Sequence, residues 1–262
     1  MRFKIVVSTD TVNRLMIPIN YQYPLSSAIY RIMAKGDRQY ADFLHEKGYG
    51  KGFKFFTFSA INCPFKIEGD RLLLQHNELS FVVSFHLPEA VQYFVQGLFS
   101  SESIVIADKK SKVCFKVKAI EALPNLLASY GENQILSRTF APLSPLVIGL
   151  KNDAGNYDYR SPQDVDFISS LIYNWREKIK ASYDDVTAQS AFLFATVTYN
   201  RLPPKSRLIT IKADTPEETK IRGFVNFKLE VKAERRFLEL LGNAGAGLYN
   251  GQGMGLLEIV ED

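Results

Sequence analysis

The stretch LSFVVSFHLPEAVQYFVQGLF, residues 79–99, decides the fold because a strand-like segment passes directly into a helical one. The strand-like segment, residues 79–87, follows a similar run, RLLLQ, in residues 71–75. In residues 88–99 the apolar side chains show the i, i+3, i+4, i+7 spacing of an amphipathic helix. Those side chains are Val91, Phe94, Val95 and Leu98. We therefore expect a β-hairpin followed by a helix.

Extended in both directions, the pattern of the first half is β-α-β-β-α-β, which is the ferredoxin-like arrangement. The further expected elements are a strand over residues 2–8, a helix that starts near Ser26 after Pro24, a short helix that Asp37 caps and that runs to Leu44, a strand in residues 53–61 and a closing strand in residues 113–123. This order predicts an α+β fold.

The second half repeats the order less clearly. Its expected elements are a strand in residues 145–150, a long helix over 161–183 that Ser161 caps ahead of Pro162, strands in 190–200 and 207–214 joined by a bend at 201–205, a strand in 223–231, a short helix over 235–241 and a final strand in 255–260. Residues 124–134 break the pattern. We predict two tandem ferredoxin-like (βαββαβ) domains, 1–124 and 135–262, with a cleft between them where a ligand would bind.

The composition indicates a packed protein of one large domain or two ordinary ones. The chain has 262 residues, of which 46% are hydrophobic and 13% are aromatic, and this excludes a disordered chain. No apolar run approaches the roughly 18 to 20 residues of a membrane-spanning helix. The first residues lack the pattern of a signal peptide. We expect a cytoplasmic protein with no membrane partner.

Cysteine and histidine are too scattered for a nitrogen and sulfur metal site. Cys63 and Cys114 belong to no zinc-binding motif, so both are expected to be buried free thiols. The histidines are His45, His76 and His86, and no two are neighbours. We expect no metal of this kind and no cofactor. Composition alone leaves a carboxylate site for Mg²⁺ open.

The positive charge is concentrated in two windows. Residues 31–66 carry seven Lys or Arg against three acids, and residues 201–236 carry ten against five. The two windows therefore sum to +9, which leaves −5 for the rest of a chain whose net charge is +4. Such asymmetry favours a polyanion-binding face, although charged runs are also ordinary solvated surface.

Six of the 16 glycines lie within residues 242–255, just before the last expected strand. The spacing and the short distance to the chain end do not fit a dinucleotide-binding motif, and no G-K-[S/T] follows for a nucleotide P-loop. We expect a loop of exposed amides between helix and strand, which can bind anions. A flexible surface turn is the alternative.

Together, GAGLYNGQGMGLLEI at residues 245–259 and the segments IYRIM, FLHE and KFFTFS near the N-terminus resemble a known family. This family is that of the CRISPR repeat-processing endoribonucleases, the sixth CRISPR-associated protein family, which belongs to the repeat-associated mystery protein superfamily. That superfamily has a G-x-G, about five residues and a second G-x-G before the last strand. Gly245 and Gly247, then Gly253 and Gly255, fit this spacing, with Asn250 between the pairs.

The resemblance implies metal-independent cleavage of CRISPR repeat transcripts. The ribose 2′-OH attacks the adjacent phosphate and leaves a 2′,3′-cyclic phosphate and a 5′-OH. The family's tyrosine, histidine and lysine fall by position on Tyr30, His45 and Lys54, and Lys51 and Lys47 compete for the lysine role. The residue types suit the reaction, because histidine transfers protons near neutral pH and an ammonium stabilises phosphate charge.

Each catalytic candidate has a structural alternative. His45 at a helix end can be a favourable contact with the helix dipole, and Tyr30 can be half-buried packing. His76 and His86 are expected to be structural or exposed. The residues expected to bind RNA are Lys47, Lys51, Arg201, Lys205, Arg207, Lys212, Arg235, Arg236, Gly245, Gly247, Asn250, Gly253 and Gly255.

The implied partner is CRISPR repeat RNA, and subunits of a CRISPR effector complex or a second copy of this chain are further candidates. Two other functions stay open. A catalytically inactive relative would hold repeat RNA in an effector complex without cutting it. An unrelated ferredoxin-like enzyme would act on a small acidic metabolite, against which the two basic windows and the lack of a cofactor motif argue.

Overall fold

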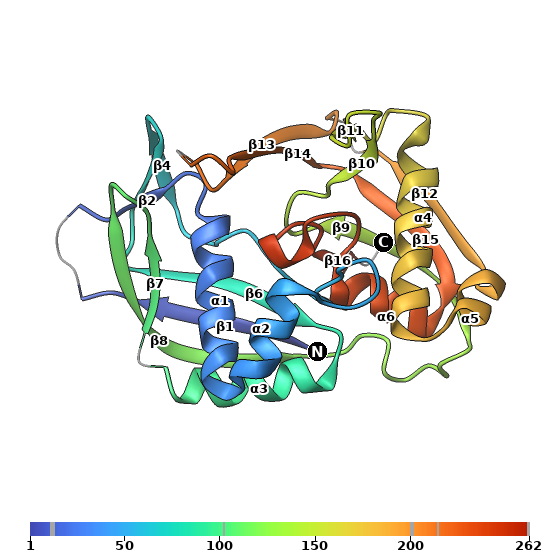
Figure 1. Cartoon of the computed structure of the whole chain (residues 1–262), viewed down its shortest axis with the longest axis horizontal. Helices are drawn as coiled ribbons and strands as arrows, with labels where there is room; N and C mark the ends of the chain where they lie inside the picture. The colour runs from blue at the N-terminus through green and yellow to red at the C-terminus, as the bar shows by residue number, and fades with distance from the viewer. Residues whose placement is uncertain (11–13, 102, 200–201, 214, 261–262) are drawn as a thin grey trace.

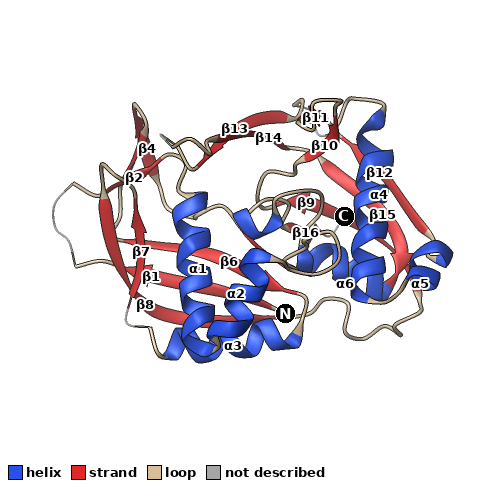
Figure 2. Ribbon diagram, viewed as in Figure 1, coloured by secondary structure: helices blue, strands red, loops and turns tan. Residues whose placement is uncertain are grey.

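The computed structural model describes residues 1–10, 14–101, 103–199, 202–213 and 215–260. Its two halves lie side by side, each with a sheet and its own helices (Figure 1, Figure 2). The α+β class and the pair of ferredoxin-like folds predicted from the sequence are confirmed.

The first half is built on a five-stranded sheet with the order β3-β6-β1-β8-β7. Its elements are β1 (Arg2–Ser8), α1 (Gln22–Gly36), α2 (Arg38–Glu46), β3 (Phe56–Phe58), β6 (Glu78–Phe85), α3 (Pro88–Phe99), β7 (Ser103–Ala107) and β8 (Lys112–Leu123). Leaving out β7, this is the antiparallel ferredoxin-like order. Helices α1 and α3 pack on each other and bury their apolar faces against the sheet.

The second half repeats this topology in a four-stranded sheet with the order β12-β15-β9-β16. Its elements are β9 (Ile135–Pro142), α4 (Asp166–Ser182), α5 (Asp185–Ser190), β12 (Leu193–Thr198), β15 (Lys228–Glu234), α6 (Arg235–Ala244), the 3-10 turn η1 (Asn250–Gln252) and β16 (Leu257–Val260). Helices α4 and α6 contribute Trp175 and Phe237 to a separate hydrophobic core. The division into domains 1–124 and 135–262 stays a prediction.

Three smaller sheets are added to these two units. They are β2 (Met16–Pro18) with β5 (Arg71–Leu74) and β4 (Phe65–Glu68), β10 (Ile148–Lys151) with β11 (Tyr157–Arg160), and β13 (Lys205–Ile211) with β14 (Thr219–Val225). In Figure 1 the β13–β14 hairpin lies along the top of the molecule, above both halves. It touches the first half where Thr210 N donates to Asn20 Oδ1 at 3.0 Å, and the second half through the Leu146–Phe224 bridge.

Several expected elements were wrong in partner or boundary. Residues 71–75 do not form a hairpin with 79–87, because β5 pairs with β2 and β4 whereas β6 pairs with β1 and β3. Similarly, β12 and β13 belong to different sheets, so these two expected strands do not pair with each other. The expected strand over 223–231 is divided between β14 and β15, at Asn226 with φ of 65°.

Helix starts were also placed imperfectly. Helix α4 begins at Asp166 rather than at Ser161, whose backbone N–H donates to Asp164 Oδ2 at 2.7 Å in a turn before the helix. Helix α1 begins at Gln22 rather than near Ser26. The cap of α2 is confirmed, since Asp37 accepts a hydrogen bond from Tyr40 N.

Two further expectations concern thiols and membranes. Cys63 is buried as expected, but Cys114 is exposed on β8, because it faces away from the helices that cover the sheet. Among the described residues, no helix has both the length and the apolar character needed to cross a membrane.

His86 lies between the two halves, where its Nε2 is 3.2 Å from Ser182 Oγ at the end of α4. Burial lowers its pKa from the usual 6.5 to about 4, and the nearby N-terminal amino group adds to this shift. The folded protein therefore keeps His86 neutral at a pH where the unfolded chain takes up a proton.

We expect the free energy of unfolding to fall as the pH is lowered from about 6.5 to about 4, by at most about 1.4 kcal/mol per pH unit from this group. Urea unfolding midpoints of wild type and His86→Gln across this range measure the effect. The variant should lose less stability than wild type on acidification. If the urea midpoints of wild type and His86→Gln fall by the same amount as the pH is lowered, His86 is not the titrating group.

Candidate active site

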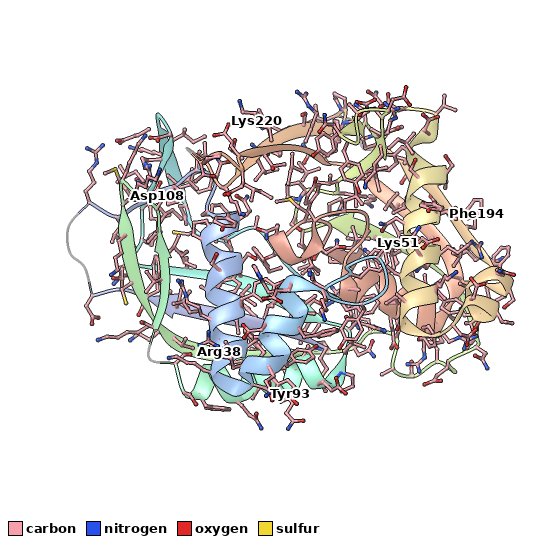
Figure 3. The ribbon with its side chains drawn as sticks, viewed as in Figure 1. Arg38, Lys51, Tyr93, Asp108, Phe194 and Lys220 are labelled. Carbon is pink, nitrogen blue, oxygen red and sulfur yellow. The ribbon has the colours of Figure 1, made fainter. Side chains whose placement is uncertain are left out.

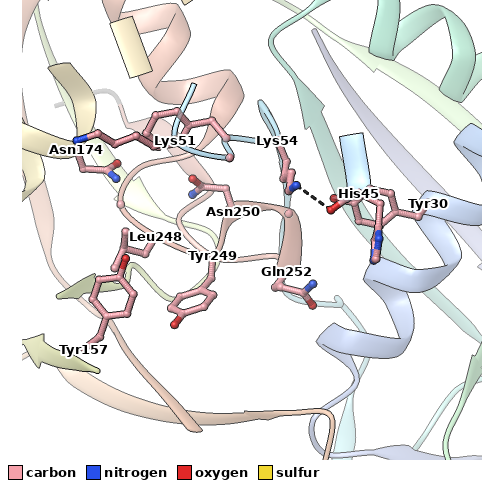
Figure 4. Close-up of a pocket in the computed structure, with 14 residues that line it drawn as sticks. Tyr30, His45, Lys51, Lys54, Tyr157, Asn174, Leu248, Tyr249, Asn250 and Gln252 are labelled. Atoms are coloured by element: carbon pink, nitrogen blue, oxygen red, sulfur yellow. Dashed lines mark hydrogen bonds between the residues drawn. The ribbon is translucent and has the colours of Figure 1, made fainter. Parts of the chain in front are cut away.

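A cavity of about 370 Å³ lies where the two halves meet, and both contribute residues to its lining. Figure 4 shows Tyr30, His45 and Lys54 on one side of it, and Tyr157, Leu248 and Tyr249 on the other. The described lining residues are Tyr30, His45, Lys51, Gly52, Phe53, Lys54, Tyr157, Asn174, Gly247, Leu248, Tyr249, Asn250, Gly251 and Gln252. The structure therefore brings the three catalytic candidates together with the glycine-rich loop.

Tyr30 and His45 come from neighbouring helices and their rings are in contact. The ring centroids are 5.1 Å apart at an interplanar angle of 88°, with Tyr30 on α1 and His45 in the last turn of α2. Tyr30 is held from behind by Phe56, whose ring centroid is 5.3 Å away. His45 is exposed, and Tyr30 is half-buried. Burial raises the pKa of Tyr30, so its phenol keeps its proton and is able to donate a hydrogen bond.

Among the lysine candidates, Lys54 has a side chain that is hydrogen-bonded to His45. Its Nζ donates to the main-chain oxygen of His45 at 2.9 Å, at the C-terminal end of α2, where a cation is favourable. Partial burial lowers the pKa of Lys54. Lys51 also lines the cavity, but its Nζ donates to Tyr173 Oη at 2.7 Å and pairs with Glu177 at 3.0 Å. Lys47 is exposed and is not part of the described lining.

The segment before β3 links this site to the second half. Phe55 has φ of 50° and its ring belongs to the hydrophobic core of the second half, not of the first. The adjacent Lys54 and Phe56 instead belong to the cavity lining and to the first core. Phe55 therefore anchors the segment that carries Lys54 against the domain with the glycine-rich loop.

The glycine-rich loop, residues 245–256, is mostly buried, so the expectation of a loop of exposed amides was wrong, and the alternative of a surface turn does not describe it either. From the first half, Ser26 Oγ donates to Gly251 O at 2.6 Å and Thr57 Oγ1 donates to Met254 O at 2.8 Å. A Cβ placed on Gly251 would lie 3.3 Å from Tyr30 Oη and 3.1 Å from Lys54 Cγ. The loop is therefore seated directly against two of the catalytic candidates.

Lys178 on α4 holds the loop from the other side, and it is not among the residues predicted from the sequence. Its Nζ donates to Gly245 O at 2.5 Å, Gly247 O at 3.0 Å and Asn250 Oδ1 at 2.6 Å. Burial lowers the pKa of Lys178 to about 7, whereas three acceptors around one ammonium favour the charged form. A lysine within the apolar stripe of the long helix was the signal that could have revealed it.

Asn250 was expected to contact RNA, but the structure gives its side chain a role inside the loop. Its Nδ2 donates to Ala246 O at 3.0 Å and to Met254 O at 2.9 Å, while Oδ1 accepts from Lys178. With both ends of the amide occupied and the residue buried, its side chain shapes the loop rather than facing solvent.

We expect Lys178→Met to lower the free energy of unfolding by about 3 kcal/mol or more, because three buried acceptors lose a charged donor. Lys180→Met is the matched control on the same helix, since Lys180 is exposed and pairs with Asp185 at 2.8 Å. That change should cost less than about 1 kcal/mol. Urea unfolding midpoints measure both effects, and equal midpoints would contradict the role given to Lys178.

Of the other side chains predicted to bind RNA, those of Lys205, Arg207 and Lys212 are described by the structure and do not line the cavity. Lys205 and Arg207 are exposed on β13. The partner strand of β13 in the hairpin is β14, which carries Lys220 (Figure 3). Lys212 follows β13 and lines a different cavity, next to Asp70 and Asp108. Arg201 lies outside the described residues.

The structure also separates Arg235 and Arg236 from the cavity. They lie at the first turn of α6, whose last residue is next to Gly245, so roughly 15 Å of helix separates them from the loop. Arg235 pairs with Glu132 and Glu239, and Arg236 pairs with Glu234. Both guanidinium groups are thus engaged by nearby carboxylates.

Both domains match models of one protein family. Residues 16–120 match the model described as CRISPR-associated protein Cas6, N-terminal, and residues 131–259 match CRISPR associated protein Cas6, C-terminal. The curated CRISPR-associated endoribonuclease Cas6 of Pyrococcus furiosus is 27% identical over 188 residues, which are 71% of this chain and 66% of the relative. The CRISPR-associated endoribonuclease Cas6 1 of Methanocaldococcus jannaschii is 28% identical over 189 residues, which are 71% of this chain and 68% of the relative.

Solved structures agree in fold. The structure of a Cas6-related gene product from Pyrococcus furiosus superposes with a TM-score of 0.80 at 20% identity, covering 100% of this chain and 99% of the other. A RAMP protein that binds different RNA substrates superposes with a TM-score of 0.78 at 19% identity, covering 100% of both chains. With both of its domains matched by models of the same family, this chain belongs to the Cas6 family of CRISPR-associated proteins.

Proposed function

We propose that this protein is a metal-independent endoribonuclease that cleaves CRISPR repeat transcripts. The observation that carries the proposal is the cavity in which Tyr30, His45 and Lys54 meet the glycine-rich loop. Proteins named CRISPR-associated endoribonucleases that are 27% and 28% identical to this chain support it. The described lining contains no Asp or Glu, the residue types that Mg²⁺ prefers, and this agrees with proton-transfer chemistry on an anionic ligand.

In the proposed reaction, the ribose 2′-oxygen attacks the neighbouring phosphorus and the 5′-oxygen of the next nucleotide leaves. The 2′-OH loses its proton, the leaving oxygen gains one, and the products carry a 2′,3′-cyclic phosphate and a 5′-OH. His45 exchanges one of these protons, because an imidazole does so near neutral pH.

The other two groups act on the phosphate and the nucleophile. The Lys54 ammonium stabilises the additional negative charge on the phosphate oxygens. The Tyr30 phenol, which burial keeps protonated, donates a hydrogen bond that positions the 2′-oxygen or a phosphate oxygen. The loop at Gly251, seated against both side chains, limits where the phosphate can lie.

The test uses the full chain, the CRISPR repeat RNA of the same genome and excess EDTA. A second RNA carries a 2′-deoxy group at the nucleotide before the cleavage point. Cutting of the first RNA and sparing of the second, with a cyclic phosphate on the upstream product, is the expected result. Tight binding of both without cutting would instead support the inactive repeat-binding subunit. Association with effector-complex subunits or with a second copy stays a prediction.

A further inference from the structure

Tyr157 and Tyr249 line the cavity opposite His45, and Tyr159 contacts both of them from outside the described lining; we call these three residues the tyrosine wall. Tyr157 and Tyr159 stack with ring centroids 6.4 Å apart and an interplanar angle of 23°. Tyr249 meets Tyr157 at 6.1 Å and 73°. Its hydroxyl is 3.5 Å from that of Tyr159. None of these three tyrosines is among the predicted catalytic residues, so the proposed cleavage chemistry does not explain their presence at the cavity.

The tyrosine wall is held in place by its surroundings. Tyr159 and Tyr249 pack against a hydrophobic cluster that includes Val147 and Met254. Tyr249 also has φ of 58°, a backbone conformation that costs free energy for a residue with a side chain. The rings of Tyr157 and Tyr249 nevertheless remain partly exposed and line the cavity. Fixed aromatic faces on an open cavity are suited to stacking a flat ligand.

Next to the wall is a polar group without a partner. The Oε1 atom of Gln252 is buried and accepts no hydrogen bond from any described residue. In Figure 4 the Gln252 amide lies between Tyr249 and the Tyr30–His45 pair. A buried acceptor of this kind is costly unless a ligand supplies a donor, and every RNA base carries an N–H on its pairing edge. Gln252 also follows Gly251, which touches Tyr30 and Lys54.

From these positions we propose that the tyrosine wall and Gln252 form a subsite for one unpaired nucleobase, belonging to a nucleotide that flanks the cleaved phosphate. The base stacks on Tyr157 or Tyr249, and the side chain of Gln252, which lines the cavity, turns its buried and unpaired Oε1 toward an edge N–H of that base. The subsite rests on the proposed function, because it places this base beside the phosphate that His45 and Lys54 act on. It requires the RNA to be single-stranded at that nucleotide, since a paired base has no free face or edge.

The experiment measures affinity with uncleavable repeat RNA that carries the 2′-deoxy group. The bases at two positions on each side of the cleavage point are replaced, one at a time, by abasic residues. At one of these positions the dissociation constant of wild type should rise about 5- to 150-fold, the range expected for loss of one stacked base. In the variant that lacks the stacking ring, Tyr157→Leu or Tyr249→Leu, the abasic replacement at that position should change the dissociation constant less than about twofold. The reason is that the stacking contact is already absent.

Conservative and distant variants separate stacking from folding defects. Tyr157→Phe and Tyr249→Phe keep the ring and should behave as wild type in the abasic series. Tyr93→Leu, on α3 and outside the described lining of the cavity, should retain the full abasic effect (Figure 3). An abasic effect of the same size in wild type and in both leucine variants would overturn the subsite.

Failure of the subsite differs from failure of the proposed function. If wild type cleaves repeat RNA but no abasic position weakens binding, the subsite alone is wrong. If wild type neither binds nor cleaves the repeat, both proposals are wrong. Strong weakening by Tyr157→Leu with no dependence on any abasic position would mean that the ring only supports the fold, and would also overturn the subsite.

Discussion

Replacing His45 with alanine is expected to lower the single-turnover rate of repeat cleavage about 100-fold or more, the usual contribution of one proton-transfer group. RNA affinity should change little, because His45 is a single exposed side chain at the end of α2. The protein should also remain stable, since the ring is not part of either hydrophobic core. Rates measured at saturating protein separate the chemical step from binding.

His76→Ala is the matched control, because His76 is an exposed histidine of the first half outside the described lining of the cavity. It should cleave at the wild-type rate. Single-turnover rates of wild type, His76→Ala and His45→Ala, measured side by side, make the comparison. An undiminished rate in that variant would remove His45 from the mechanism.

Gly255→Ala is expected to lower the free energy of unfolding by about 2 to 5 kcal/mol, through backbone strain and overpacking together. The residue has φ of +73°, and an added Cβ would lie 1.9 Å from the backbone oxygen of Ala246. Neither partner can move easily, because Gly255 N donates to Pro145 O at 2.9 Å and Ala246 N donates to Gly255 O at 2.8 Å. Cleavage should fall on the order of a hundredfold, since the loop positions Gly251 against the proposed catalytic side chains Tyr30 and Lys54.

The control is Gly155→Ala, which separates backbone strain from the clash. Gly155 has φ of +79°, but nothing lies within 4 Å of the position that its Cβ would take. Its replacement should cost only about 1 to 2 kcal/mol and leave cleavage unchanged. Thermal or urea unfolding of both variants measures the difference. Equal losses would show that the glycine-rich loop tolerates a side chain at residue 255.

The sequence predicted best those elements whose signals are local. The apolar spacing in residues 88–99 matches α3, Pro88–Phe99, and Asp37 caps α2 through its own side chain. Strand pairing depends instead on partners distant in the chain. The strand-like runs at 71–75 and 79–87 looked like a hairpin, yet β5 and β6 lie in different sheets. Nothing within these short runs distinguishes the two outcomes.

In the candidate site, too, features with a local signal were predicted and features that depend on distant contacts were not. Residue type and a family resemblance sufficed to name Tyr30, His45 and Lys54, and the structure places them in one cavity, while their roles stay predictions. The hydrogen bonds from Lys178 that support the glycine-rich loop could not be predicted from the sequence, because Lys178 and Gly245 are 67 residues apart in the chain. Arg235 and Arg236 looked available in the sequence, and only the fold shows the carboxylates that engage them.

The most direct test of the central claim is the structure of this protein bound to repeat RNA that a 2′-deoxy group makes uncleavable. We predict that the phosphate at the cleavage point lies in the cavity between the two halves, within hydrogen-bonding distance of His45 and Lys54 and against the loop at Gly251. A cleavage-point phosphate bound on another face of the molecule, with His45 turned to solvent, would contradict the account.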